Sequence, residues 1–215
     1  MNKVNKQLVS VILFVFALSC EQKQKEPVVQ SQSPKADSSL IKPVVPELTQ
    51  NTYASIDISP MDMSYFPVDY PKLKMANPNL PPPVMRLIYS RPHLQRRALF
   101  HGILKYNEPW RLGANEASEI NFYRNVTIQG RKIKPGRYII YGIPHPDKWI
   151  IALNSNIDTW GLKQDTAKDV ARFEIPVATN DKTLEYFTMV FEKTASGANL
   201  IIAWADVVAR LPIRF

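Results

Sequence analysis

Hydrophobic and polar residues alternate one by one along much of the chain after Val84. Phe173, Ile175 and Val177 occupy every second position of one such stretch. Successive side chains of a β-strand point to opposite faces, so this alternation predicts strands with one buried face. The predicted strands are Met85–Ser90, Glu119–Ile128, Arg137–Gly142, Trp149–Asn154, the segments around Phe173–Val177 and Phe187–Phe191, Leu200–Trp204 and Val207–Ile213.

Residues that favour turns separate these stretches. They are found at Gly130, at Pro135-Gly136, within Pro144–Asp147 and at Ser196-Gly197. No helical repeat is sustained, and only Thr166–Ala171 is expected to form a short turn of helix. Many short strands separated by turns predict an all-β fold, either an antiparallel β-sandwich of the jelly-roll kind or a related barrel. We assign this β-sandwich domain to residues 84–215.

The beginning of the chain has a different pattern, in which Lys3 and Lys6 precede a largely apolar run from Leu8 to Leu18. A charged segment followed by an apolar run is the layout of a secretory signal. The run is shorter than the roughly 20 residues that a helix needs to span a bilayer. Residues 1–19 are therefore expected to direct export.

Cys20 follows this run and is the only cysteine in the chain, so it cannot form an internal disulfide. The stretch "ALSC" that ends at Cys20 resembles the lipobox of bacterial lipoproteins, in which the cysteine becomes the first mature residue and carries the lipid. We therefore expect a lipid on Cys20 and an anchored protein in the cell envelope, at the outer membrane. The alternative is ordinary cleavage after Ser19, which leaves a free thiol.

Two further segments separate Cys20 from the predicted strands. Residues 20–50 are rich in glutamine, serine and proline and contain no glycine or aromatic residue, which predicts a disordered tether. Residues 51–83 contain seven prolines, all between Pro60 and Pro83. Because proline lacks a backbone N–H, we expect neither a central strand nor a helix here, but an extended arm packed along the domain. The alternative is an exposed patch of methionines and aromatic residues that docks a partner.

The formal net charge is +8, and basic residues are concentrated between Arg86 and Arg111, where Glu108 is the only acid. One carboxylate cannot neutralise this cluster, so either a solvated basic face or an anion-binding pocket is expected. An exported chain rarely meets nucleic acid, so an anionic glycan or an acidic partner is the expected ligand. The basic residues of this segment are Arg86, Arg91, His93, Arg96, Arg97, His101, Lys105 and Arg111.

Strand parity relates this cluster to the stretch "EPWRLGANEAS". Arg91 continues the buried face of Met85–Ser90, and Glu116 continues the face of Ile120 backwards. We therefore predict that Arg91 and Glu116 form an ion pair or face each other across a small pocket, with Trp110 packed beside them. In the structural interpretation, Gly113 and Asn115 adopt positive φ and Trp110 plugs the core. In the functional interpretation, a pocket is lined by Arg91, His93, Arg97, Trp110, Arg111, Asn115 and Glu116.

Several motifs together resemble a known family. They are "YSRP", "RRALFHGILKYNEPWRLGANEAS", "GRKIKPGRYIIYGIP", "WIIALN" and "TWG". From about Val84 to Ile213 the chain resembles the bacterial family called domain of unknown function 2911. The resemblance implies no particular reaction, but it does imply an exported or lipid-anchored protein.

Two classes of function remain open. The first is a non-enzymatic binding or interaction module held at an envelope membrane. The second is a hydrolase or lyase that acts on an envelope or dietary polymer, with Glu116 as general acid or base and Arg91 or Arg111 holding an anionic group. A carboxylate pair of Glu116 with Glu119 is not expected, because their strand parity differs. The histidine spacing and the absence of phosphate-loop or nucleophile motifs favour binding without metal or cofactor.

Overall fold

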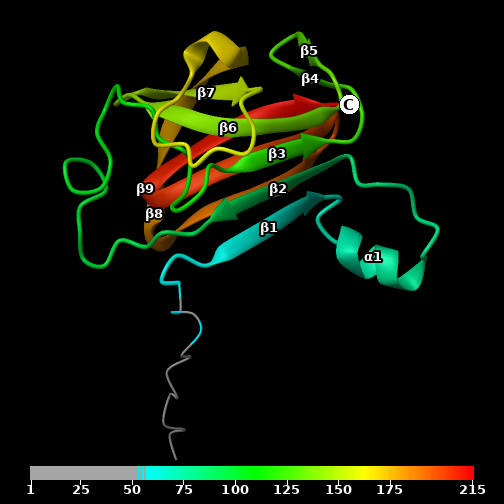
Figure 1. Ribbon diagram of the computed structural model, residues 1–215, viewed down its shortest axis with the longest axis horizontal. Coiled ribbons are helices and arrows are strands. Elements are labelled where there is room, and N and C mark those ends of the chain that lie inside the picture. The colour runs from blue at the N-terminus through cyan, green and yellow to red at the C-terminus, as the bar shows by residue number, and fades with distance from the viewer. Residues whose placement is uncertain (1–52, 54, 56) are drawn as a thin grey trace, which may run out of the picture. The chain divides into compact units, whose positions relative to one another are not determined.

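The computed structural model describes residues 53, 55 and 57–215, and this described part contains nine strands and one α-helix (Figure 1). The expected signal peptide, Cys20 and the whole expected tether, residues 20–50, lie outside the described residues. The elements, in chain order, are β1 (Met61–Phe66), α1 (Tyr70–Ala76), β2 (Met85–Ser90), β3 (Glu119–Phe122), β4 (Val126–Ile128), β5 (Arg131–Ile133), β6 (Gly136–Pro144), β7 (Lys148–Asn154), a 3-10 helix (Thr166–Lys168), β8 (Asp169–Thr194) and β9 (Gly197–Arg214).

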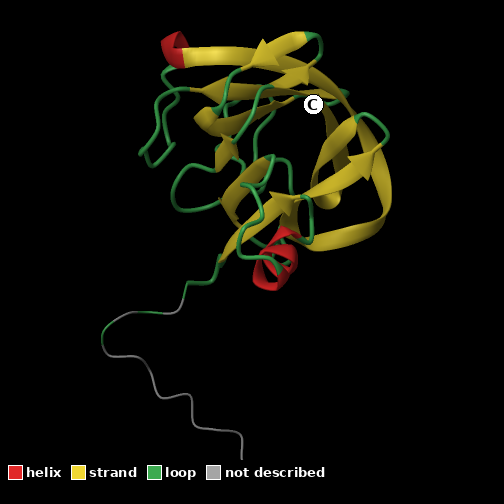
Figure 2. Cartoon of the chain, turned by 90° about the vertical axis from the view of Figure 1, so that its right-hand side faces the viewer, coloured by secondary structure: helices red, strands yellow, loops and turns green. Residues whose placement is uncertain are grey.

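The nine strands form one antiparallel sheet in the order β1-β2-β3-β6-β7-β8-β9-β4-β5. The predicted all-β, antiparallel class is thus confirmed, and the sheet is not closed into a barrel. The strands curve strongly, and the sheet folds over on itself (Figure 2).

The long strand β8 makes this folding possible. Its first part, Asp169–Pro176, pairs with β7, and its second part, from Val177 onward, pairs with β9. The register shifts between Thr179, Leu184 and Thr188, and such irregularities let a strand bend. The sequence predicted two strands here because the residues between them are polar, and it likewise divided β9 in two.

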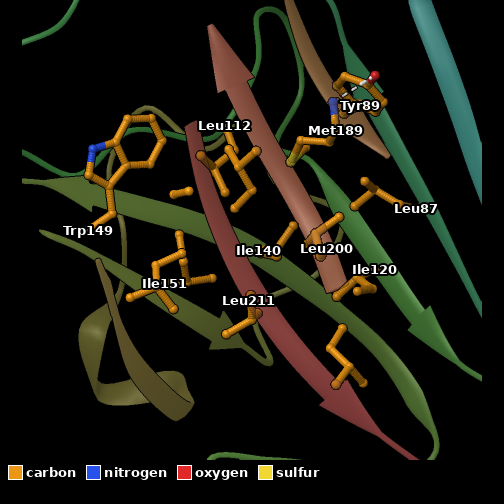
Figure 3. Close-up of a cluster of buried hydrophobic side chains, with 14 of the residues drawn as sticks. Leu87, Tyr89, Leu112, Ile120, Ile140, Trp149, Ile151, Met189, Leu200 and Leu211 are labelled. Carbon is orange, nitrogen blue, oxygen red and sulfur yellow. Dashed lines mark hydrogen bonds between the residues drawn. The ribbon is translucent and has the colours of Figure 1, made fainter. Parts of the chain in front are cut away.

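A single core fills the space between the two halves of the sheet. Leu87, Ile120 and Ile140 contribute to it from β2, β3 and β6, and Leu200 and Leu211 contribute from β9 (Figure 3). Each of these side chains is almost completely buried. Burial of one such side chain contributes about 1.5–3 kcal/mol, so the core accounts for most of the favourable free energy. The predicted alternation therefore identified the buried face correctly.

The proline-rich segment contains regular structure before Val84. The edge strand β1 pairs with β2 along its whole length, and it contains no proline. The expectation that this segment forms no helix is wrong, because α1 spans Tyr70–Ala76. Pro71 lies in the first turn of α1, where a helix does not use the backbone N–H, and the helix ends before Pro78.

Other boundaries differ from the prediction. The stretch Glu119–Ile128 is divided into β3 and β4, and Arg131–Ile133 forms the additional strand β5. Of the predicted helical turn, only Thr166–Lys168 is helical. Within the described residues, no helix combines the length and the apolar character that crossing a membrane requires.

Candidate functional site

The stretch Glu108–Ser118 is an irregular loop that is fixed to the sheet at both ends. The backbone N–H of Trp110 donates to Gly142 O at 2.7 Å, and the Gly142 N–H donates back to Trp110 O at 2.9 Å. At the other end, the backbone N–H of Ile140 on β6 donates to Ser118 O at 2.9 Å, and the Ser118 hydroxyl donates within the loop to Leu112 O at 2.6 Å. The loop is thus an ordered part of the fold, and its side chains have defined positions.

Two residues in this loop have a positive φ, namely Leu112 at 52° and Asn115 at 58°. The expected positive φ is therefore correct for Asn115 but wrong for Gly113. Glycine is needed at 113 for close approach, because a Cβ there would lie 3.1 Å from both Ser90 O and Ser118 Oγ.

Trp110 belongs to an aromatic cluster at one end of the core. Its ring centroid lies 4.7 Å from that of Phe187 and 5.6 Å from that of Trp204, on which it stacks, and it meets Trp149 edge to face. The indole N–H of Trp110 donates to Gly113 O at 3.1 Å. Trp110 is half-buried and covers this end of the core, as the structural interpretation expected.

A cavity of about 430 Å³ lies beside Trp110, and we call it the Trp110 cavity. Its walls are mostly apolar or neutral, with two cationic side chains, Arg97 and Arg111. None of the described residues that line it carries a carboxylate. The lining residues are Ile58, Ser59, Pro92, Gln95, Arg97, Ile103, Leu104, Pro109, Trp110, Arg111, Gly113, Ala114, Gly161, Leu162 and Trp204.

Neither arginine of the Trp110 cavity forms an ion pair within residues 57–215. Arg97 donates only to backbone carbonyls, from Nε to Leu94 O at 2.9 Å and from Nη2 to His93 O at 3.0 Å. Arg111 is half-buried, and its Nε is buried without a hydrogen-bond partner. Burial lowers the pKa of Arg111, and the nearby charge of Glu116 opposes this shift. The cavity is therefore electropositive.

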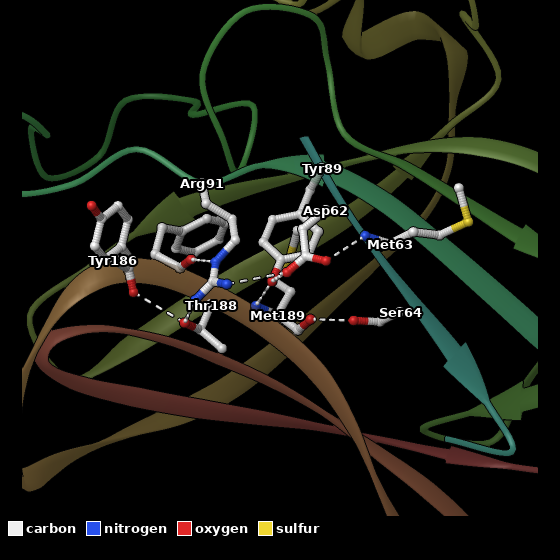
Figure 4. Close-up of polar contacts among 9 residues, drawn as sticks. Asp62, Met63, Ser64, Tyr89, Arg91, Tyr186, Thr188 and Met189 are labelled. Atoms are coloured by element: carbon white, nitrogen blue, oxygen red, sulfur yellow. Dashed lines mark hydrogen bonds and ion pairs between the residues drawn. The ribbon is translucent and has the colours of Figure 1, made fainter. Parts of the chain in front are cut away.

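Arg91 does not pair with Glu116, contrary to the prediction. Its Nη1 lies 3.3 Å from Asp62 Oδ2, and its Nε and Nη2 donate to Phe187 O and Thr188 Oγ1, each at 3.2 Å (Figure 4). The prediction failed because it did not include β1, the strand that supplies Asp62.

The same network holds Tyr89 at the boundary of the core. The Tyr89 hydroxyl accepts a hydrogen bond from the backbone N–H of Met189 at 2.9 Å. Burial raises the pKa of Tyr89 to about 12. Ser64 of β1 also donates to Met189 O at 2.8 Å, so side chains join β1 to the second part of β8 (Figure 4).

Glu116 is exposed because the chain before β3 is not extended. The positive φ of Asn115 interrupts the alternation on which the parity argument relied. Glu116 lines a second depression, the Glu116 hollow, together with Glu119. Both carboxylates thus line one hollow although the sequence placed them on opposite faces, but Glu119 is bound by Arg137.

The other two candidates also lie outside the Trp110 cavity. The His93 ring stacks on Tyr186, with centroids 5.1 Å apart, and its Nδ1 lies 3.6 Å from Glu185. The Asn115 side chain donates to Asp57. Of the seven candidate residues, the structure brings three together, namely Arg97, Trp110 and Arg111.

A family model described as "Protein of unknown function (DUF2911)" matches residues 74–213. The chain belongs to this family. The match confirms the resemblance carried by the motifs. No curated protein and no solved structure matches the chain.

The DUF2911 match includes the whole loop Glu108–Ser118 and the cavity walls apart from Ile58 and Ser59. Sequence reasoning missed Trp204 and Leu162 as parts of this site. Two signals in the sequence were available. Trp204 ends a predicted strand, and Leu162 directly follows "TWG". No signal in the sequence identified Ile58 and Ser59. They lie just before β1, and only the folding of the chain brings them to the cavity.

The chemistry that this DUF2911 site offers is binding of negative charge. Guanidinium groups bind carboxylate, sulfate or phosphate oxygens through paired hydrogen bonds. In the described part of the chain, no three His, Cys, Asp or Glu side chains cluster as a metal site requires.

Proposed function

We propose that this DUF2911 protein is a lipid-anchored protein of the cell envelope whose domain binds an acidic sugar of a glycan in the Trp110 cavity. The observation that carries the proposal is the presence, in one cavity beside an aromatic cluster, of two arginines that form no ion pair with any described residue. Binding is the primary activity, and it requires no cofactor.

An anionic ligand would correct an unfavourable feature of the free cavity. A buried polar group without a hydrogen bond costs roughly 1–3 kcal/mol, and the Nε of Arg111 is such a group. A carboxylate or sulfate oxygen would not reach this buried Nε, but it would pair with the terminal nitrogens of Arg111 and offset the desolvation of the guanidinium. Arg97 adds a second positive charge, so a neutral ligand would gain less.

The size and the walls of the cavity favour a sugar over a bare ion. Small-molecule sites commonly measure about 300–1,000 Å³, and the volume of about 430 Å³ lies in this range. Trp110, Leu162 and Ile103 supply apolar surface for the body of such a ligand.

The anchor is the second part of the proposal. The lipobox resemblance at Cys20 supports attachment to a membrane, and several acyl chains anchor a protein firmly, at about 0.8 kcal/mol per buried methylene. Residues 20–50 would then link the lipid to the domain.

Calorimetric titration of the full-length protein in detergent tests the binding site. Glucuronate and glucose have the same ring size and differ in charge, so we expect glucuronate to bind at least about tenfold more tightly. Arg111→Met should remove this preference, whereas Arg131→Met, an exposed arginine on β5, should not. Equal binding of the two sugars, or equal behaviour of the two variants, would contradict the proposal. Binding of acidic peptides alone would redirect it to a protein partner.

The hydrolase or lyase alternative draws support from one observation, the placement of Glu116 and Glu119 in one hollow. Glycosidases use two carboxylates. However, Glu119 is held by Arg137 through two hydrogen bonds, at 2.9 and 3.0 Å, which favours a charged structural role. Polymer turnover that Glu116→Gln abolishes would establish the enzyme instead of the binding module.

A further inference from the structure

The Glu116 hollow lies on the outer face of the sheet and has a volume of about 580 Å³. Arg86 and Ile88 reach it from β2, Glu119 from β3 and Arg137 from β6. The register places Ile88 opposite Glu119. Met61 of β1 closes one side, and the loop that lines the Trp110 cavity with Arg111 continues here with Glu116 and Ala117.

Two of the four charged groups in this hollow neutralise each other. Arg137 donates from Nε and Nη2 to the two carboxylate oxygens of Glu119, and Nη2 also lies 2.9 Å from Asp158 Oδ1. These contacts use the charges of Glu119 and Arg137 within the protein. Neither group therefore needs a ligand.

The remaining two charged groups are unpaired. Among the described residues, Arg86 and Glu116 form no ion pair, either with each other or with another side chain. Arg86 is half-buried, and its Nε is buried without a hydrogen-bond partner. Glu116 is exposed at the rim. The hollow thus presents one positive and one negative group that form no ion pair, although the charge of Glu116 also acts on Arg111.

We propose that the Glu116 hollow binds a small zwitterion of the α-amino acid class with an apolar side chain. The ligand carboxylate accepts from the terminal nitrogens of Arg86, because its Nε is buried out of reach of a ligand, and the ligand ammonium group donates to Glu116. Met61 and Ile88 provide apolar contact for the side chain. This site does not rest on the function proposed for the Trp110 cavity.

The charge pattern excludes simpler ligands. A polyanion would meet the carboxylates of Glu116 and Glu119, and like charges at close range are unfavourable. A plain cation would leave Arg86 desolvated and unpaired, at a cost that a carboxylate removes. Only a ligand with both charges satisfies both free groups.

Three related probes test this site in the full-length protein. Leucine carries both charges, leucine amide lacks the carboxylate, and N-acetylleucine lacks the ammonium group. By calorimetric titration we expect saturable binding of leucine and at least about tenfold weaker binding of each blocked derivative, because each loses one charged hydrogen-bond pair. No saturation by leucine up to about 10 mM, or equal binding of all three, would overturn the proposal.

Variants assign the two ends of the ligand. Glu116→Gln should weaken leucine binding and remove the difference between leucine and N-acetylleucine, and Arg86→Met should do the same for leucine amide. Glu192→Gln, an exposed carboxylate on β8 outside the hollow, should leave leucine binding unchanged. Thermal melting checks folding, and Glu116→Gln, at an exposed position, keeps the test decisive even if Arg86→Met does not fold. Leucine binding that Glu116→Gln leaves unchanged would contradict the assignment.

Discussion

Arg91 lies just after β2, where its guanidinium joins three groups from other strands. Asp62 comes from β1, and the Phe187 carbonyl and the Thr188 hydroxyl come from β8. The Arg91 and Asp62 side chains are 34% and 40% exposed, so water screens their attraction. Arg91 thus connects three strands and stabilises their arrangement moderately.

This position leads to a prediction about stability. We expect Asp62→Asn to lower the free energy of unfolding by about 1 kcal/mol, because Arg91 keeps its other two hydrogen bonds. Glu116→Gln should change it by less than about 0.5 kcal/mol, because Glu116 is exposed and unpaired. Urea denaturation of both variants and of Arg91→Met with Asp62→Asn measures these effects. A larger loss for Glu116→Gln than for Asp62→Asn would show that Glu116 is the true partner of Arg91.

At the scale of elements, the edge strand β1 connects several distant parts of the fold. It lies at the edge of the sheet, yet Phe66 at its end is buried and packs against Phe191 and Phe215. Ser64 and Asp62 add the contacts to β8 and Arg91. The residues before β1, Ile58 and Ser59, form part of the Trp110 cavity. This strand therefore supports both the core and the proposed site.

Truncation tests the role of β1. A chain that begins at Gln50 should unfold in one cooperative transition, as we also expect of the full-length protein. A chain that begins at Val84 should lose this transition or aggregate, because it exposes the edge of β2 and the apolar surface under Phe66. Circular dichroism during heating distinguishes the two. Equal melting of both chains would show that the residues before Val84 are dispensable for folding.

At the scale of the whole molecule, the proposed lipid anchor at Cys20 would determine where the domain is located. Cys20 and the apolar run before it form the basis of the proposed anchor. A glycan-binding site on an anchored protein would act close to the membrane surface. In this proposal, residues 1–50 determine where the protein is located, and the domain after them determines what the protein binds.

Replacement of the cysteine tests the anchor without altering the domain. Cys20→Ser should move the protein from the membrane fraction to the soluble fraction, while the melting temperature and the affinity for glucuronate stay the same. Fractionation followed by immunoblotting measures this change, and Ser19→Ala, a small residue at the neighbouring position, is the matched control. If Cys20→Ser remains with membranes as the wild type does, the protein is not anchored through this residue.

The sequence by itself determined the all-β class and most of the strands after Val84. It succeeded because a strand with one face in the core must alternate apolar and polar residues, and this local pattern is visible without knowledge of the partner strands. It also selected Arg97, Trp110 and Arg111, since an excess of basic residues around a tryptophan is a local property of the chain.

Only the tertiary structure decided which of these residues meet. The partner of Arg91 is Asp62, 29 positions earlier, because an edge strand from the proline-rich segment pairs with β2. Glu116 faces outward because one residue with positive φ ends the alternation before β3. Strand parity holds only while the backbone remains extended, and pairing between distant segments depends on how the sheet folds over, so neither could be read from spacing along the chain.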